Sequence, residues 1–285
     1  MSFLPSPPSY WDVPAKSRYR SGRRQRWLSV SIGVGWLLST MLLPLDTEAL
    51  RAEAQVVTPT RGAGFVIIGS LMFDESGNSV SDAGDVNGDG LADVIVGAFT
   101  AAPNGQSSAG RSYVVFGKHS HLPVALSVIE SGSSPDGFVI NGSNEGDASG
   151  LSVSGAGDVN GDGLADVIVG AFTAAPNAKV NAGRSYVVFG KRKRQPVELS
   201  AIESGSSPDG FVINGSNGQD LSGQSVSGAG DINGDGLADV IVGAPGAYGN
   251  GLQGAAGRSY VVFGKRSIQP VELANLETAR PSPSP

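Results

Sequence analysis

Oxygen-bearing side chains recur at fixed spacing in one nine-residue stretch of the chain. Asp85, Asn87, Asp89 and Asp93 occupy its positions 1, 3, 5 and 9, and the backbone carbonyl of Leu91 at position 7 adds another oxygen. Ca²⁺ takes roughly 6–8 oxygen ligands, and a glycine at position 6 lets the loop turn sharply around the ion. Without a cation, three carboxylates this close would repel one another. The stretch therefore predicts a calcium loop.

The loop differs from an EF-hand. An EF-hand begins with the same six positions but needs a bidentate glutamate at position 12 and a helix on either side. Here position 12 is valine, within Val-Ile-Val-Gly-Ala, a β-branched run that predicts a buried strand. The loop thus joins two strands, and it recurs at 158–166 and 231–239. A plain hairpin turn without metal is the alternative, because Asn-Gly and Asp-Gly are strong hairpin signals.

No set of residues typical of an enzyme stands out beside these loops. The sequence has no cysteine nucleophile, no Gly-x-Ser-x-Gly elbow and no phosphate-binding glycine loop. His119 and His121 are its only histidines, and a solvated turn is expected there rather than a zinc or general-base pair. The basic run 191–194 is also expected to be a solvated loop, with contact to an anionic polymer or lipid headgroup as the alternative. We expect no catalytic activity.

The first 54 residues are expected to direct export. Residues 1–26 are basic, residues 27–45 are largely apolar, and Ala52-Glu53-Ala54 resembles a cleavage site. Cleavage would leave a secreted, periplasmic or cell-surface chain that begins near Gln55. If the segment is uncleaved, residues 27–45 are nearly long enough to anchor the chain in a membrane. The acidic balance, with 20 Lys+Arg against 26 Asp+Glu, argues against nucleic acid as a partner.

The rest of the chain, residues 55–277, consists of a unit that recurs about every 73 residues. The units span about 62–130, 131–203 and 204–277, and a Pro/Ser tail at 278–285 is expected to be disordered. Each unit has four short apolar segments separated by turn residues, which indicates four antiparallel strands. The sequence therefore predicts an all-β fold with about three β-propeller-type blades. In the second unit the strand segments are 137–142, 152–157, 165–171 and 184–190.

Two features of the units concern local structure. Residues 126–130 and 199–203 fit either one helical turn or the lead into a strand. Arg111, Arg184 and Arg258 open the same strand in every unit. We expect each arginine to pair with an aspartate or a backbone carbonyl of its own blade.

The connection before each arginine is where the units differ most. These connections are residues 100–109, 173–182 and 246–256. Because ligand contacts on scaffold folds tend to lie in such loops, we expect any ligand there, with Tyr248 and Leu252 as candidate contacts. Drift in loops that tolerate change is the alternative.

The units resemble FG-GAP repeats, the blades of the amino-terminal β-propeller of integrin alpha chains and of many bacterial secreted proteins. The resemblance covers residues 62–277 and includes Phe116-Gly117, Phe189-Gly190, Phe263-Gly264 and Gly243-Ala244-Pro245. It implies that each loop binds Ca²⁺ between two strands of a blade, giving about three ions. The implied ligands are Asp85, Asn87, Asp89, Leu91 and Asp93, then Asp158, Asn160, Asp162, Leu164 and Asp166, then Asp231, Asn233, Asp235, Leu237 and Asp239.

The resemblance implies an extracytoplasmic calcium-binding protein that acts as a binding or adhesion module for a protein or surface polymer. A truncated or structural fragment of a larger repeat assembly is the alternative, and a propeller associated with a hydrolase is a weaker one. Three blades cannot close a ring, because propellers have roughly four to eight. Self-association, pairing with another repeat protein, or a chain shortened from a longer ancestor would each resolve this. We expect one of these three.

Overall fold

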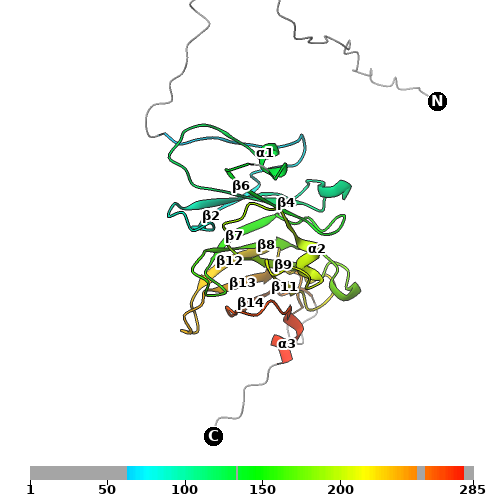
Figure 1. Cartoon of the computed structure of the whole chain (residues 1–285). Coiled ribbons are helices and arrows are strands. Elements are labelled where there is room, and N and C mark those ends of the chain that lie inside the picture. The colour runs from blue at the N-terminus through cyan, green and yellow to red at the C-terminus, as the bar shows by residue number, and fades with distance from the viewer. Residues whose placement is uncertain (1–62, 133, 249–253, 279–285) are drawn as a thin grey trace, which may run out of the picture. The chain divides into compact units, whose positions relative to one another are not determined.

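The computed structural model describes residues 63–278, except residue 133 and residues 249–253. The predicted export segment, the tail from residue 279 and Leu252 therefore lie outside the described residues. Figure 1 shows a fold built almost entirely of strands, arranged as three main antiparallel sheets. Within the described ranges, no helix is long and apolar enough to cross a membrane.

The first two sheets each contain four consecutive antiparallel strands, in the orders β2-β3-β4-β6 and β7-β8-β9-β11, and the third contains β12-β13-β14. Blades of four antiparallel strands are thus confirmed in two sheets, and the third has three strands among the residues described. The bounds are β2 Ser79–Gly84, β3 Asp93–Ala98, β4 Arg111–Val115, β6 Gly137–Asn141, β7 Ser152–Gly157, β8 Asp166–Ala171, β9 Arg184–Val188, β11 Gly210–Asn214, β12 Ser225–Gly230, β13 Asp239–Ala244 and β14 Arg258–Val262.

A short parallel pairing follows the outer edge of each repeat. β5 pairs with β1, β10 with β6, and β15 with β11. Each of these lead strands runs directly into a short helix, so the segments 126–130 and 199–203 form helical turns and the strand pairing is made by the two residues before each. The bounds are β1 Ile67–Ile68, β5 Val124–Ala125, β10 Val197–Glu198, β15 Val271–Glu272, α1 Leu126–Glu130, α2 Leu199–Glu203, α3 Leu273–Thr278, and the 3₁₀ turns η1 Pro103–Gly105 and η2 Pro176–Ala178.

The sheets are offset by one strand from the sequence units. β6 opens the second unit of the sequence, but it pairs with β4 and completes the first sheet. β11 likewise completes the second sheet by pairing with β9. β1 occupies the equivalent position at the start of the first unit, and it pairs only with β5 among the described strands. Each complete sheet therefore draws its fourth strand from the following repeat.

The sheets pack on one another through their first strands. β2 contacts β7, and β7 contacts β12. The backbone N–H of Val153 donates a 3.1 Å hydrogen bond to Oγ of Ser79, and Val226 makes the same bond, at 3.0 Å, to Ser152. Buried apolar clusters extend across both interfaces, with Val153 in one and Val226 in the other. The same packing contacts therefore recur at both interfaces between sheets, as the sequence recurs in the three units.

Each repeat contains an arginine–glutamate pair. Nη1 of Arg111 lies 3.3 Å from Oε2 of Glu130. Its Nε also donates a 3.3 Å hydrogen bond to the side chain of Asn141. The expectation of an aspartate or carbonyl partner was wrong, because the short helix after the lead strand carries a glutamate back to the arginine. Equivalent ion pairs join Arg184 to Glu203 at 3.1 Å and Arg258 to Glu277 at 2.7 Å.

Candidate metal centre

Each predicted calcium loop joins the first and second strands of its sheet. In the first loop, both carboxylate oxygens of Asp85 accept backbone N–H groups from within the loop. Oδ1 accepts from Gly88 at 2.7 Å and Asp89 at 3.0 Å, and Oδ2 accepts from Gly90 at 2.9 Å. Gly88 and Gly90 have φ values of 73° and 88°, which glycine adopts without strain. The loop therefore folds around its first carboxylate.

The last aspartate of the loop plays a different part. Asp93 has no solvent exposure, and its two oxygens accept one backbone N–H each. Oδ2 accepts from Val86 at 2.9 Å, and Oδ1 accepts from Gly117 at 2.8 Å. Gly117 belongs to the Phe-Gly pair that follows β4, so Asp93 connects the loop to the end of the strand that pairs with β3. Asp166 and Asp239 make the same two bonds in the other repeats, each at 2.8 Å.

Burial makes Asp93 and Asp166 costly to ionise. Loss of solvent raises the pKa of Asp166 to about 7, although two backbone N–H donors favour its charged form. The nearby charges of Asp162 and Asp158 raise it further. The pKa of Asp93 is raised for the same reasons, first burial and then, to a lesser extent, Asp89 and Asp85. The acids of one loop therefore repel one another, and a cation among them would relieve that repulsion.

The donor set fits a hard cation such as Ca²⁺. Each loop offers three carboxylates, an amide oxygen and a carbonyl, and a carboxylate oxygen that accepts one N–H keeps a lone pair for a metal. The described residues contain no group of three acidic, histidine or cysteine side chains gathered closely enough to hold an ion. Binding would thus require the half-buried Asp85 and the exposed Asp89 to exchange loop hydrogen bonds for metal contacts. The ligand assignment stays a prediction.

A basic side chain from the next repeat lies over the first loop. Arg192 and Arg194 line a pocket of about 370 Å³ together with Asn87, Gly88 and Asp89. A Cβ placed on Gly88 would lie 3.4 Å from Nε of Arg192. Residues 192–194 are exposed, as the sequence predicts. Lys191 is an exception to that prediction, because burial lowers its pKa and its ammonium lies over the ring of Phe138.

The other candidate residues form no second site. His119 and His121 are both exposed, and the nearest polar partner of the His121 ring is the carbonyl of Gly64 at 3.3 Å. In the variable connections, Tyr248 is 58% exposed, whereas Pro103 and Pro176 are buried. No structural feature gathers Tyr248 with other polar side chains among the residues described. A ligand in these connections stays a prediction.

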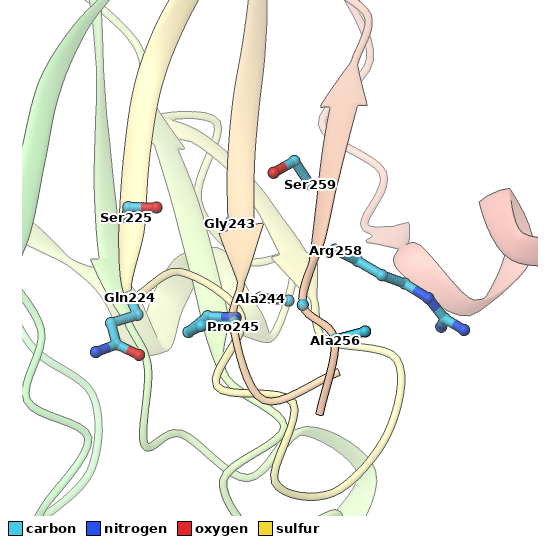
Figure 2. Close-up of a pocket in the computed structure, with 9 residues that line it drawn as sticks. Gln224, Ser225, Gly243, Ala244, Pro245, Ala256, Arg258 and Ser259 are labelled. Carbon is cyan, nitrogen blue, oxygen red and sulfur yellow. The ribbon is translucent and has the colours of Figure 1, made fainter. Parts of the chain in front are cut away.

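A larger pocket of about 670 Å³ lies on the third sheet, and Ala256 is the one described residue of the connection 246–256 that lines it. Figure 2 shows Ser225, Gly243 and Ser259 around it, on the neighbouring strands β12, β13 and β14. Gly257 also lines it.

Comparison with known proteins settles what the repeats are. The FG-GAP repeat model matches residues 77–115, from before β2 to the end of β4, and residues 222–262, from before β12 to the end of β14. Each match contains one aspartate-rich loop and the strands on both sides. The chain contains FG-GAP repeats. The second repeat, between the two matches, has the same strands and the same hydrogen bonds around its loop.

Three relatives of these FG-GAP repeats belong to two kinds of protein. Integrin alpha pat-2 of Caenorhabditis elegans is 28% identical over 166 residues, 58% of this chain and 13% of that protein. Integrin alpha-PS2 of Drosophila melanogaster is 30% identical over 216 residues, 73% of this chain and 14% of that protein. Phosphatidylinositol-glycan-specific phospholipase D of Bos taurus is 30% identical over 197 residues, 68% of this chain and 21% of that protein. The chain therefore spans about a fifth or less of the length of these relatives.

Proposed function

We propose that this chain is an extracytoplasmic calcium-binding protein that acts as a binding or adhesion module. The observation that carries the proposal is the threefold repetition of one loop framework. In all three repeats, a buried aspartate accepts the N–H of the glycine in the Phe-Gly pair while the first aspartate of the loop accepts three loop amides. Similarity to integrin alpha chains supports the adhesion role and a location outside the cytoplasm.

Calcium in this proposal is structural. Asp85, Asn87, Asp89 and Asp93 would hold the first ion together with the carbonyl of Leu91, and the equivalent residues would hold the other two. The ion would supply a positive charge that offsets the repulsion among the carboxylates. Because it binds the folded chain, each site would stabilise the fold by about 2.7 kcal/mol when free Ca²⁺ is at 100 times the dissociation constant. Each bound ion would thereby hold the loop between the first and second strands of its sheet in one conformation.

No catalytic role is part of the proposal. One relative is named as a phospholipase, and the similarity to it covers 21% of its length. In the described part of this chain, the pockets of about 670 and 370 Å³ are lined in part by serines, arginines, Lys118 and loop carboxylates, and neither lining contains a histidine or a cysteine. Among these residues both histidines are exposed and neither lines either pocket, although His119 directly follows Lys118 of the smaller one. This arrangement favours a binding module over an enzyme.

Thermal unfolding with different cations tests the proposal. The full chain should melt at a higher temperature in millimolar Ca²⁺ than in excess chelator, and Mg²⁺ should give a smaller rise because it demands a tighter octahedral set of ligands. Equal melting temperatures in Ca²⁺ and in chelator would contradict the calcium role. For the proposed location, amino-terminal sequencing of the exported chain should start near Gln55, and a chain retained in the cytoplasm would contradict it.

A further inference from the structure

The first and third sheets each have an apolar face that no other described sheet covers. Val80 on β2 is 64% exposed, whereas the equivalent Val153 and Val226 are 5% and 8% exposed, buried against the preceding sheet. On the opposite face of the third sheet, Phe263 is 54% exposed, whereas the equivalent Phe189 is 8% exposed. Side chains buried at every internal interface are therefore left open at both outer faces.

The internal interfaces show what such a face accepts. A Cβ placed on Gly170 of the second sheet would lie 2.0 Å from the carbonyl oxygen of Gly223, and one on Gly183 would lie 1.9 Å from that of Ser222. The backbone of a Ser-Gly pair thus packs against two glycines of the preceding sheet. The space above those two glycines, which a side chain would fill, is called the socket. The first interface repeats both contacts, at Gly97 with Gly150 and at Gly110 with Ser149.

On the third sheet the same socket is open. Gly243 and Gly257 hold the equivalent positions, and a Cβ on Gly257 would meet nothing closer than 3.6 Å. A Cβ on Gly243 would lie 2.3 Å from Oγ of Ser225 and 3.6 Å from its carbonyl oxygen, both within its own sheet, and would meet no backbone of another sheet. The pocket of about 670 Å³ in Figure 2 is this open socket.

One Ser-Gly pair of the chain fills no socket. Ser76 and Gly77 precede β2 as the other two pairs precede β7 and β12. Gly77 has a φ of 94°, close to the 90° and 88° of Gly150 and Gly223. The first repeat therefore carries the element that the third sheet's socket accepts, already in the conformation that the internal interfaces use.

The strand edges show the same complementarity. Within the described ranges, no strand pairs with the outer edge of β14, where β4 pairs with β6 and β9 with β11. In the first repeat, the segment that aligns with β6 and β11 is 64–69. Its sequence is Gly-Phe-Val-Ile-Ile-Gly, and the other two repeats have Gly-Phe-Val-Ile-Asn-Gly at this place. Val66 and Ile68 are 63% and 49% exposed there. Among the described residues, β14 thus has an unpaired outer edge, and a strand of matching sequence, β1, pairs with β5 on one edge and with no strand on the other.

We propose that a second copy of this chain docks head-to-tail on the third sheet. Ser76–Gly77 of one copy enters the socket at Gly243 and Gly257 of the other, and residues 65–68 add a fourth antiparallel strand beside β14. Val80 is buried against the third sheet, as Val153 is against the first. The backbone N–H of Val80 then donates to Oγ of Ser225, repeating the bonds that Val153 and Val226 make at the internal interfaces.

The contact is heterologous, so copies must close into a ring or extend into a filament. Two copies bring together six of the main sheets that the described residues form, since β1 and β5 of each copy join the third sheet of the other, and propellers have roughly four to eight blades. Two is the one number of three-blade copies that falls in that range. The proposal is therefore a closed dimer with six blades, each of which has four strands.

Cysteine pairing between differently tagged chains tests the contact, because the chain has no cysteine of its own. Ser112 is opposite Ile140 and Ser185 is opposite Ile213, so Ser259 should be opposite Ile67 of the second copy. Opposite residues lie about 4.5–5.5 Å apart, within the range of a disulfide. Full-length Ser259→Cys and Ile67→Cys chains carrying different tags should, on co-expression and oxidation, give a covalent dimer with both tags. Either variant alone should give at least tenfold less.

A matched pair of surface variants controls for folding. Val80→Asp should lower the yield of the mixed dimer at least tenfold, because it places a charge in the interface. Val180→Asp, at a residue that is 61% exposed in a connection away from both faces, should leave the yield unchanged. Absence of the mixed dimer while both cysteine variants melt like the parent would overturn the proposal. If another strand occupies the β14 edge, the mixed dimer will be absent. A covalent dimer made by Ser259→Cys alone would overturn the head-to-tail arrangement.

Discussion

Tyr186 donates a 2.6 Å hydrogen bond from its phenol to Oε1 of Glu203, from the middle of β9 to the end of the short helix α2. The other carboxylate oxygen of Glu203 pairs with Arg184, so one glutamate holds both a buried phenol and a cation. Burial raises the pKa of Tyr186, with the charge of Glu203 as the next cause. This group fixes the helix against the third strand of the blade, and the first repeat has the same contact between Tyr113 and Glu130 at 2.6 Å.

Tyr186→Phe should therefore lower the free energy of unfolding by about 1.5–3 kcal/mol, the usual loss for a hydrogen bond to a charged group. Denaturation in urea measures it. Tyr248→Phe is the matched control, since Tyr248 is 58% exposed, and it should change the free energy by less than about 0.5 kcal/mol. Equal effects of the two substitutions would show that the phenol contributes nothing through Glu203.

Asp162→Ala should lower the melting temperature in Ca²⁺ and change it much less in chelator. Asp162 is a predicted ligand, and without metal it loses only exposed bonds to Leu164 and Asn160, at 2.9 and 3.0 Å. Differential scanning calorimetry in both buffers measures the two shifts. Glu145→Ala removes the same charge at an exposed residue and should shift neither. Equal losses in Ca²⁺ and in chelator would contradict a ligand role.

Gly170→Ala should destabilise the chain by more than 2 kcal/mol, because its Cβ would lie 2.0 Å from the carbonyl oxygen of Gly223 in the next sheet. At Gly218 the nearest atom would be 3.3 Å away, so Gly218→Ala is the milder control. Chemical denaturation compares the two. A Gly170→Ala chain as stable as the parent would mean that the second and third sheets do not pack this closely.

The buried aspartates predict an unusual pH dependence in chelator. Folding raises the pKa of Asp166 from 3.8 to about 7, so between these values the folded chain binds more protons than the unfolded one. This group therefore stabilises the fold at low pH, and the stabilisation is lost as pH rises from about 4 to about 7. When the pH is raised from about 5 to about 8, the melting temperature of the parent should therefore fall more than that of Asp166→Asn. A parent and variant with the same pH dependence would contradict the raised pKa.

The sequence predicted the strands and the loops well because their signals are local. Val-Ile-Val beside Asp-Gly marks a strand and its turn without reference to any other segment. Partner choice is not local, and there the prediction failed. Nothing in the sequence of Gly137–Asn141 indicates that this strand pairs with β4, before it, rather than with the strands after it. The glutamate that pairs with Arg111 is Glu130, 19 residues further along the chain. The buried role of Asp93 also depends on Gly117, which only the closed sheet brings near.

The number of Ca²⁺ ions bound per chain tests the account most directly. Native mass spectrometry of the full chain, titrated with Ca²⁺ from a chelated start, counts them without any assumption about stability. The account predicts three ions per chain, and two when Asp158, Asp162 and Asp166 are all replaced by asparagine. A chain that takes up no Ca²⁺ at millimolar concentration would contradict the account and leave the three loops as hydrogen-bonded turns.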